Sequence, residues 1–257
     1  MAQSLCNIDK KSFIPGEQLQ YQLYYNLGFV WINAGDCELS VHSSTWNDRT
    51  AYQLKAIGKT RKSFDSFFKI RDSLISYVDP FDLTPFKAIK IAHENAWKGE
   101  DDYTFKKAGS GWRITTKLKR KNVWHDPVES YTTACGFDIL TSLYRLRCIS
   151  DSELFNKFNR IEISVRLDDG EYKVYLTYLG KDSVNLHGDG NYPAHAFRMT
   201  LIEGNVFKSG DVLKFWISDD KNRIPLMIES PLKVGMIKAI FRSAKNTLYP
   251  LARPDTY

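Results

Sequence analysis

The stretch that decides the fold is IEISVRLDDGEYKVYLTY, which covers residues 161–178. Its first half alternates apolar with polar side chains, the apolar ones being Ile161, Ile163, Val165 and Leu167. Its second half repeats the pattern through Tyr172, Val174, Leu176 and Tyr178. Successive side chains of a β-strand point to opposite faces of a sheet, and Asp-Gly between two such segments is typical of a tight turn. We therefore predict an antiparallel hairpin with one apolar face.

The same two-residue period recurs over most of the chain on both sides of this hairpin. It is clearest in residues 19–25, 37–41, 52–56, 68–78, 86–93, 103–107, 112–121, 195–202, 212–218, 224–229 and 234–241. Asn47-Asp48, Asp79-Pro80 and the Ala-Gly-Ser-Gly of residues 108–111 supply turn residues between these segments. About a dozen short strands with regular turns predict a mainly β fold, an antiparallel sheet that curves or closes to protect its edges.

One segment near the middle of the chain departs from this period. Its apolar residues follow the spacing of an amphipathic helix, and they are Ile139, Leu140, Leu143 and Leu146. Asp138 precedes them as a suitable N-cap. We predict one principal helix around residues 138–149, with Ile139, Leu143 and Leu146 packed against the sheet and Arg145 pointing more outward.

Composition agrees with a folded β protein and excludes several other classes. The 257 residues are 43% hydrophobic and 26% charged, which excludes disordered, collagen-like and coiled-coil chains. The 15 Phe, 14 Tyr and 6 Trp favour strands. No Pro/Ser-rich linker or fixed-period repeat divides the chain. We predict a single continuous β domain at 13–245, between a loose N-terminal tail at 1–12 and a C-terminal tail at 246–257.

The sequence predicts no transmembrane segment. The longest uncharged run, residues 18–35, alternates Gln and Asn with apolar residues, so it has the period of a strand. The chain opens Met1-Ala2-Gln3-Ser4 without the basic and apolar stretches of a secretory signal. This leaves two interpretations, a cytoplasmic protein or an exported one whose signal has been removed.

No motif for catalysis or cofactor binding is present. The chain lacks a nucleophile elbow, a phosphate-binding glycine loop and a dinucleotide fingerprint. Its five histidines are scattered without the spacing of metal ligands, at His42, His93, His125, His187 and His195. We predict no metal site and no cofactor, and we expect the protein not to be an enzyme.

Asp219-Asp220, followed by Arg223, is the one constellation that suggests chemistry. Two carboxylates can serve as general acid and base in glycoside hydrolysis. However, neighbouring side chains on a strand point to opposite faces, so the pair would converge only across a turn. The structural interpretation, which we favour, is a hairpin turn capped by Asp219 with Arg223 pairing across it.

One predicted strand carries a basic face. Its cations alternate with apolar residues and are Arg113, Lys117, Lys119 and Lys121, with Trp112 and Trp124 at the ends. The net charge of +6 is mild for this length. A solvated outer face, a surface for anionic lipid or glycan, and a stacking platform for single-stranded nucleic acid remain open. We favour the solvated face and expect no nucleic-acid partner.

Several short motifs resemble those of a family of exported bacterial proteins, the domain of unknown function 3108. They are Phe13-Ile14-Pro15-Gly16-Glu17 with Leu19, Tyr21, Tyr25 and Gly35; residues 138–144 with Arg147; Trp216-Ile217-Ser218-Asp219 with Arg223-Ile224-Pro225; and Gly235, Ile237 and Ala239. The resemblance implies a strongly curved antiparallel sheet, a β-roll or half-barrel, and an exported, periplasmic protein. It implies no activity. Met1-Ala2-Gln3-Ser4 would then be the remnant of a signal-peptide cleavage region.

Export would permit disulfides among the four cysteines. Four cysteines allow three pairings, and short loops cost the least closure entropy. We expect Cys135 to pair with Cys148 and Cys6 with Cys37 if the protein is exported. Four free, buried thiols remain open as the alternative.

Three functions fit these observations. The first is a non-catalytic envelope protein that binds an apolar or amphipathic ligand, such as a lipid or glycan, on the concave face of its sheet. There Trp216, opposite the buried face of Phe215 and Ile217, would present its ring while Arg223 engages an acidic headgroup. The second is a glycan hydrolase using carboxylates near Asp219. The third is a structural scaffold without a small ligand.

Overall fold

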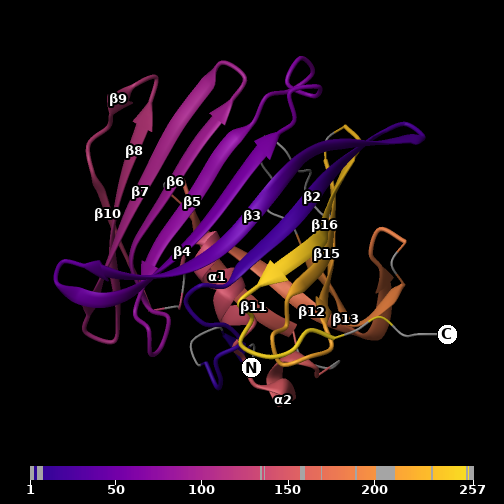
Figure 1. Ribbon diagram of the computed structural model, residues 1–257. Coiled ribbons are helices and arrows are strands. Elements are labelled where there is room, and N and C mark those ends of the chain that lie inside the picture. Colours follow the sequence, from indigo (N-terminus) through magenta and orange to yellow (C-terminus); the bar gives the residue numbers. More distant parts are fainter. Residues whose placement is uncertain are drawn as a thin grey trace.

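In the residues that the structure describes, the protein consists of one large antiparallel sheet and two short helices (Figure 1). This computed structural model describes residues 3–4, 8–133, 135, 137–156, 160–168, 170–188, 190–200, 212–232, 234–252 and 254. The sheet curves strongly around the helices, which lie at the lower centre of Figure 1. The predicted mainly β fold with one principal helix is confirmed.

The strands follow one another in a long meander, apart from two long-range joins, the parallel pairing of β1 with β11 and the antiparallel pairing of β16 with β2. Along the sheet the order is β1 (Gln3–Ser4), β11 (Arg160–Leu167), β12 (Gly170–Asn185), β13 (Asn191–Thr200), β14 (Val212–Ser218), β15 (Pro225–Pro231), β16 (Met236–Lys245), β2 (Gln18–Leu27), β3 (Val30–Trp46), β4 (Arg49–Thr60), β5 (Arg71–Val78), β6 (Pro85–Glu94), β7 (Trp97–Ala108), β8 (Gly111–Arg120) and β10 (Val128–Thr132), and β9 (Val123–Trp124) pairs with β8. At the second of these joins Ile237 on β16 pairs with Tyr25 on β2. Antiparallel neighbours joined by short turns account for almost the whole sheet.

The hairpin predicted from residues 161–178 is present as β11 and β12. Ile161 pairs with Leu176, and the strands turn between Leu167 and Gly170. Asp168 adopts a positive φ of 49° in this turn, a conformation that Asp tolerates better than most residues.

The two ends of the sheet meet along a seam that side chains bridge. Arg166 on β11 donates to the Ser130 hydroxyl on β10 at 2.9 Å, and the Thr132 hydroxyl donates to the Glu171 carboxylate at 3.3 Å. Between the two strands the chain runs through Phe137, whose carbonyl accepts the Arg166 N–H at 2.8 Å. The sheet therefore wraps almost into a barrel without a continuous ladder across this seam.

The principal helix, α1 (Ile139–Leu146), begins where the sequence predicts. The Asp138 carboxylate accepts hydrogen bonds from the backbone N–H groups of Leu140, at 3.1 Å, and Thr141, at 3.0 Å. This is the N-cap geometry expected of an aspartate. A second, single-turn helix, α2 (Asp151–Leu154), follows. None of the helices in the described ranges combines the length and the apolar character needed to cross a bilayer.

The predicted inward face of α1 is confirmed for two residues and wrong for the rest. Leu146 is buried and Leu143 packs against a buried core, as predicted. Ile139 is 42% exposed, whereas Arg145 is only 2% exposed. The helix lies inside the curved sheet and is covered on several sides, so a one-sided apolar stripe does not describe it. Arg145 is accommodated because its guanidinium donates to the Asp82 carbonyl and lies over the Phe137 ring, 5.0 Å from its centroid. Burial lowers the pKa of Arg145 to about 10.

The helices contribute side chains to two apolar cores. The central core joins α1 to the middle of the sheet and includes Phe13, Leu19, Leu54, Leu140, Tyr144 and Phe241. The second core lies under β11–β14 and includes Leu154, Leu176, Phe197, Phe215 and Ile217. The hairpin of β11 and β12 therefore buries the face that its alternation predicts, with Ile161, Ile163, Val174 and Leu176 in the second core.

Neither predicted disulfide is present. Cys37 and Cys148 are free thiols, and Cys135 is disulfide-bonded, though not to Cys148. Cys6 lies outside the described residues. The loop-length argument failed because three-dimensional placement decides which cysteines approach: Cys148 is fully buried in the central core, under the end of α1.

Candidate functional site

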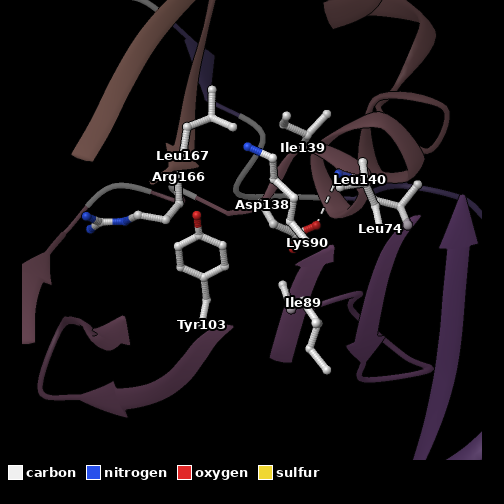
Figure 2. Close-up of a pocket in the computed structure, with 10 residues that line it drawn as sticks. Leu74, Ile89, Lys90, Tyr103, Asp138, Ile139, Leu140, Arg166 and Leu167 are labelled. Carbon is white, nitrogen blue, oxygen red and sulfur yellow. Dashed lines mark hydrogen bonds between the residues drawn. The ribbon is translucent and has the colours of Figure 1, made fainter. Parts of the chain in front are cut away.

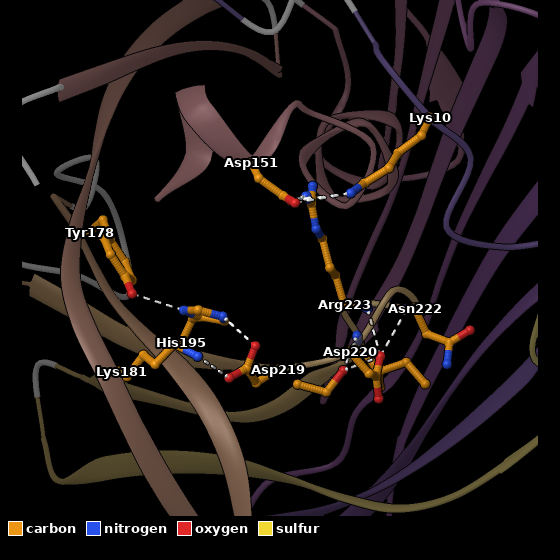
Figure 3. A network of polar contacts seen from close by, with 11 residues as sticks. Lys10, Asp151, Tyr178, Lys181, His195, Asp219, Asp220, Asn222 and Arg223 are labelled. Atoms are coloured by element: carbon orange, nitrogen blue, oxygen red, sulfur yellow. Dashed lines mark hydrogen bonds and ion pairs between the residues drawn. The ribbon is translucent and has the colours of Figure 1, made fainter. Parts of the chain in front are cut away.

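Asp219 lies directly after β14 and ends a chain of hydrogen-bonded side chains (Figure 3). His195 Nε2 is 2.8 Å from its Oδ1, and Lys181 Nζ is 2.8 Å from its Oδ2. The other ring nitrogen of His195, Nδ1, is 2.8 Å from the Tyr178 hydroxyl. Strands β12, β13 and β14 supply these residues, and a register shift between Tyr178 and Gly180 displaces Lys181 along β12. Sequence reasoning missed Tyr178, Lys181 and His195.

The charges in this chain favour an ionised aspartate. Burial raises the pKa of Asp219, but the hydrogen bonds from Lys181 and His195 outweigh it and hold this pKa below its usual value. The same contact with Asp219 raises the pKa of Lys181, and burial raises the pKa of Tyr178. A nucleophilic hydroxyl needs activation, and Tyr178 is shifted in the opposite direction.

The His195–Asp219 pair resembles the orienting half of a catalytic triad. Two contacts distinguish it from one. Both ring nitrogens of His195 are engaged, and Phe155 stacks on the ring with centroids 3.9 Å apart and planes 19° apart. The imidazole is therefore enclosed in the second core, and it ties three strands together.

Asp220 points away from Asp219 and caps the turn between β14 and β15. Its carboxylate accepts from the Ser218 hydroxyl at 2.9 Å and from the backbone N–H groups of Asn222, at 2.8 Å, and Arg223, at 3.2 Å. Its second oxygen accepts the Ala252 N–H at 2.8 Å. The two adjacent carboxylates therefore do not converge on one cleft, as a paired acid and base would require. The turn itself agrees with the structural interpretation of this motif, with Asp220 in place of Asp219 as its cap.

Arg223 is buried, and its guanidinium is occupied by the protein itself. It donates to the Ile149 carbonyl and to the Asp151 carboxylate, and it lies over the Phe155 ring at 5.2 Å. Lys10 contacts the same Asp151 carboxylate at 3.1 Å. Burial lowers the pKa of Arg223. This side chain joins the β14–β15 turn to α2 and is not placed to bind an acidic headgroup.

Trp216 lies on the other face of the sheet from His195. It pairs with Ala196 on β13, and its indole N–H donates to the Asp182 carboxylate at 2.8 Å. The ring is partly buried and packs against the central core. The structure therefore does not bring Trp216 and Arg223 together in one site.

A groove at one mouth of the curved sheet has the features of a binding site. It lies beside the β3–β4 turn and the ends of β6–β8, and its volume is about 520 Å³. Four aromatic residues and three cations line it: Trp46, Phe86, Phe105, Trp112, Arg49, Lys106 and Lys107. Lys107 Nζ lies 4.6 Å from the centroid of Trp112, and the Arg49 guanidinium lies 6.0 Å from that of Phe86. Flat apolar rings with adjacent exposed cations suit an amphipathic anion.

A second cavity, at the seam, is too small for a ligand. Figure 2 shows Asp138, Tyr103, Arg166 and Lys90 around it. Its volume is about 20 Å³, roughly the space needed by one water molecule. In the described part of the chain, no group of three or more His, Cys, Asp or Glu side chains is arranged to hold a metal ion.

The basic face predicted on residues 113–121 is partly neutralised by β7. Lys119 lies 3.9 Å from Glu100, whereas Asp102, which is opposite Lys117 in register, is paired with Lys87. Lys119 also lies over Trp124, at 5.5 Å, so this indole is already covered on one face. Arg113 pairs with Lys106, which places the uncompensated charge at the groove end of the strand.

Comparison with known proteins places the chain in a family. The sequence profile of the family described as "Protein of unknown function (DUF3108)" matches residues 20–242. The chain belongs to the DUF3108 family. No curated protein sequence matches it. A crystal structure of a beta-barrel-like protein of domain of unknown function DUF1849 from Brucella abortus is similar, with a TM-score of 0.59 and 10% identity over 90% of this chain and 97% of that one. At this identity the likeness concerns the fold alone.

In this DUF3108 protein, residues of the short motifs quoted for the family resemblance form a buried ion pair, which sequence reasoning missed. Arg147 binds Glu17 through both guanidinium nitrogens, at 2.7 and 2.8 Å, and neither side chain is open to solvent. Arg147 also donates to the Asn222 carbonyl at 3.1 Å and lies 5.3 Å from the Phe13 ring. Burial lowers the pKa of Arg147, and Glu17 raises it by more. Glu17 and Arg147 both belong to the quoted motifs, so pairing the charges of those motifs would have been the available signal.

Proposed function

We propose that this DUF3108 protein is a non-catalytic binding protein of the cell envelope, and that its mouth groove takes an amphipathic anion of the lipid or glycan class. The observation that carries the proposal is the lining of that groove, where Phe86 and Trp112 lie beside Arg49 and Lys107. Its volume of about 520 Å³ is within the range of small-molecule sites. The rings would take the apolar or sugar part, and the cations the acidic group.

The geometry at Asp219 supports a non-catalytic protein. The Tyr178–His195–Asp219 chain is enclosed by Phe155, and Asp220 is used by its own turn. In this proposal Trp216, Asp219 and Arg223 hold the strands and α2 in place, and the ligand binds elsewhere.

Export to the periplasm is part of the same proposal. The disulfide at Cys135 supports it, because disulfides persist in oxidising compartments and are rare in the cytosol. Osmotic-shock fractionation of the native host tests this point directly. Recovery of the chain only with cytosolic markers would remove the envelope from the proposal.

Native mass spectrometry of protein purified from its own cells tests the binding proposal. We expect a bound anionic lipid or glycan that the variant Lys107→Glu loses, because this exposed cation lies in the groove. Lys117→Glu is the matched control, since Lys117 is exposed on the same strand pair but away from the groove.

Tryptophan fluorescence distinguishes binding in the groove, beside Trp112, from binding at Trp216. Titration with the ligand so identified should change the emission of the parent and of Trp216→Phe. The change should be reduced in Trp112→Phe and in Trp46→Phe, because both indoles line the groove. A response lost in Trp216→Phe and kept in Trp112→Phe would move the site away from the groove. Purified protein that carries no small molecule would favour the scaffold interpretation.

A further inference from the structure

Exposed apolar side chains gather on three turns at the end of the sheet away from the helices. These are the β2–β3 turn, the β4–β5 connection and the β15–β16 turn, which lie together in the upper right of Figure 1. We call this surface the apolar tip, and its exposed members are Phe29, Val30, Trp31, Phe67, Phe68 and Val234. Phe29 is fully exposed and Phe67 is 59% exposed. Large rings at such exposure are unusual on a soluble protein and mark an interaction surface when they are contiguous.

Contacts through Tyr25 make the three turns one surface. Its ring lies 5.8 Å from that of Phe67, and its hydroxyl donates to the Val234 carbonyl at 3.1 Å. The backbone of Arg61 at the start of the β4–β5 connection donates to the Ala34 carbonyl on β3 at 2.9 Å. The apolar rings are therefore presented in fixed positions relative to one another.

Tight turns hold the exposed side chains outward. Gly235 has a φ of +76°, and a Cβ there would lie 2.3 Å from the Asn26 carbonyl oxygen, so only glycine fits beside Val234. The β2–β3 turn needs only two residues, Gly28 and Phe29, between the paired Leu27 and Val30. Because the turn has only two residues, the Phe29 side chain cannot reach the core.

Cations surround the apolar tip. Arg61, Lys62 and Lys69 are exposed on the β4–β5 connection. The acidic residue there, Asp65, is bound by Arg71 at 2.7 Å. On the other side Lys238 Nζ lies 4.6 Å from the centroid of Trp31. Arg61 and Lys238 are each paired with a carboxylate, Asp36 at 3.2 Å and Glu229 at 2.6 Å, so the net positive charge of the rim comes from Lys62 and Lys69. Positive charge beside apolar rings matches the anionic surface of a phospholipid bilayer.

We propose that the apolar tip docks on an anionic phospholipid bilayer. Phe29, Trp31 and Phe67 would enter the headgroup region, where aromatic rings are favourably placed, and Lys62 and Lys69 would contact lipid phosphates. A second copy of the chain fits less well, because it would bring two positive rims together.

This surface is separate from the mouth groove. Strand β3 begins at Val30 in the tip and ends at Trp46 beside the groove, roughly 50 Å apart along an extended strand. Docking and ligand binding can therefore be tested independently.

Vesicle co-sedimentation of the full chain tests the proposal, with vesicles of phosphatidylcholine containing phosphatidylglycerol and of phosphatidylcholine alone. We expect binding to the anionic vesicles, weakened by salt. The double variant Phe29→Ser/Phe67→Ser should lower the partition coefficient by about tenfold or more, because both rings leave water on docking. Phe81→Ser is the matched control: Phe81 is 85% exposed, between β5 and β6 at the other end of the strands, and its loss should change nothing.

Two further measurements complete the test. Brominated acyl chains should quench the tryptophan emission of the parent, and the quenching should be smaller in Trp31→Phe. The double variant Lys62→Glu/Lys69→Glu should bind anionic vesicles less than the parent. Absence of vesicle binding, or equal binding by the Phe29→Ser/Phe67→Ser and Phe81→Ser variants, would overturn the proposal. A concentration-dependent dimer that only the double variant loses would assign the tip to a second copy instead.

Discussion

Cations lie beside aromatic rings both at the helix end of the molecule, around α1, and at the apolar tip, but they are buried at the first and exposed at the second. At the helix end, Arg147 lies over Phe13 and Tyr144, with Glu17 completing its contacts and none of these groups open to water. At the apolar tip, Lys238 lies over Trp31 in a half-exposed pair. A cation beside an aromatic ring is therefore not informative by itself. Its burial separates a structural contact from a surface that is open to a partner.

This contrast also separates stability from recognition. Buried charges cost a large desolvation free energy and persist only when every partner is present. Exposed rings and cations contribute little to folding, so their arrangement is free to serve binding. We therefore expect substitutions at the helix end to change the free energy of unfolding, and substitutions at the tip to change it little.

The largest effect is expected from the buried ion pair. Glu17→Gln leaves the Arg147 charge buried without its counter-ion and should lower the free energy of unfolding by about 3–5 kcal/mol. Urea denaturation monitored by circular dichroism measures it. Asp36→Asn at the other end removes the partner of Arg61 from an exposed pair at 3.2 Å and should cost less than about 1 kcal/mol. Equal losses in the two variants would contradict the contrast between the ends.

The next effect is expected within α1. Leu140 is buried in the central core, so Leu140→Ala should cost about 2–5 kcal/mol. Ile139 is its neighbour and is 42% exposed, so Ile139→Ala should cost less than about 1 kcal/mol. The same urea titration compares them. A larger loss for Ile139→Ala would restore the helix face that the apolar spacing predicted.

The strands were predictable because their sequence pattern and their environment agree. In β11 and β12 the alternation of Ile161 and Ile163 with polar residues corresponds to one buried face, and the turn residues mark the hairpin. The cap of α1 was predictable for a similar reason, since Asp138 accepts hydrogen bonds from the first turn that follows it in the sequence. The further hydrogen bond that it accepts from Ser76 comes from a distant strand and has no local signal. Local signals of this kind survive folding.

The site residues were not predictable by the same means. Arg145 and Arg223 can be buried because carbonyl groups from distant segments accept their hydrogen bonds. The sequence around each arginine does not indicate these partners. The mouth groove combines the β3–β4 turn with the ends of β6–β8. An antiparallel meander does place those ends at the same edge, so a search for aromatic and basic residues at alternate turns would have found it.

A smaller and pH-dependent effect on the free energy of unfolding is expected from substitution of Asp219. The pKa of this carboxyl is lowered in the folded protein, so its contribution to stability is present above the unfolded pKa of about 3.9 and is lost as the pH falls through the folded value. The difference in free energy of unfolding between the parent and Asp219→Asn should be largest near about pH 7 and shrink below about pH 4. Urea titrations across this range measure it. A difference that does not vary with pH would mean that the charge of Asp219 does not contribute to stability, and that packing keeps His195 in place.

The last effect involves no change in stability and compares two thiols. Cys148 is fully buried at the helix end, and Cys37 is partly buried on β3, where burial raises its pKa to about 11. At about pH 8 only about 0.1% of such a thiol is thiolate, the form that reacts. Alkylation of the native protein should therefore be slow at both positions.

In denaturant without reductant, the modified peptides should contain Cys37 and Cys148 and not Cys135, which is disulfide-bonded. Mass spectrometry of the peptides distinguishes this result from the pairing of Cys135 with Cys148 that loop length favours, because that pairing would leave Cys148 unmodified until reductant is added. Rapid modification of Cys37 in the native protein would show instead that β3 opens to solvent on the experimental timescale, and that the middle of the sheet is less stable than either of its ends.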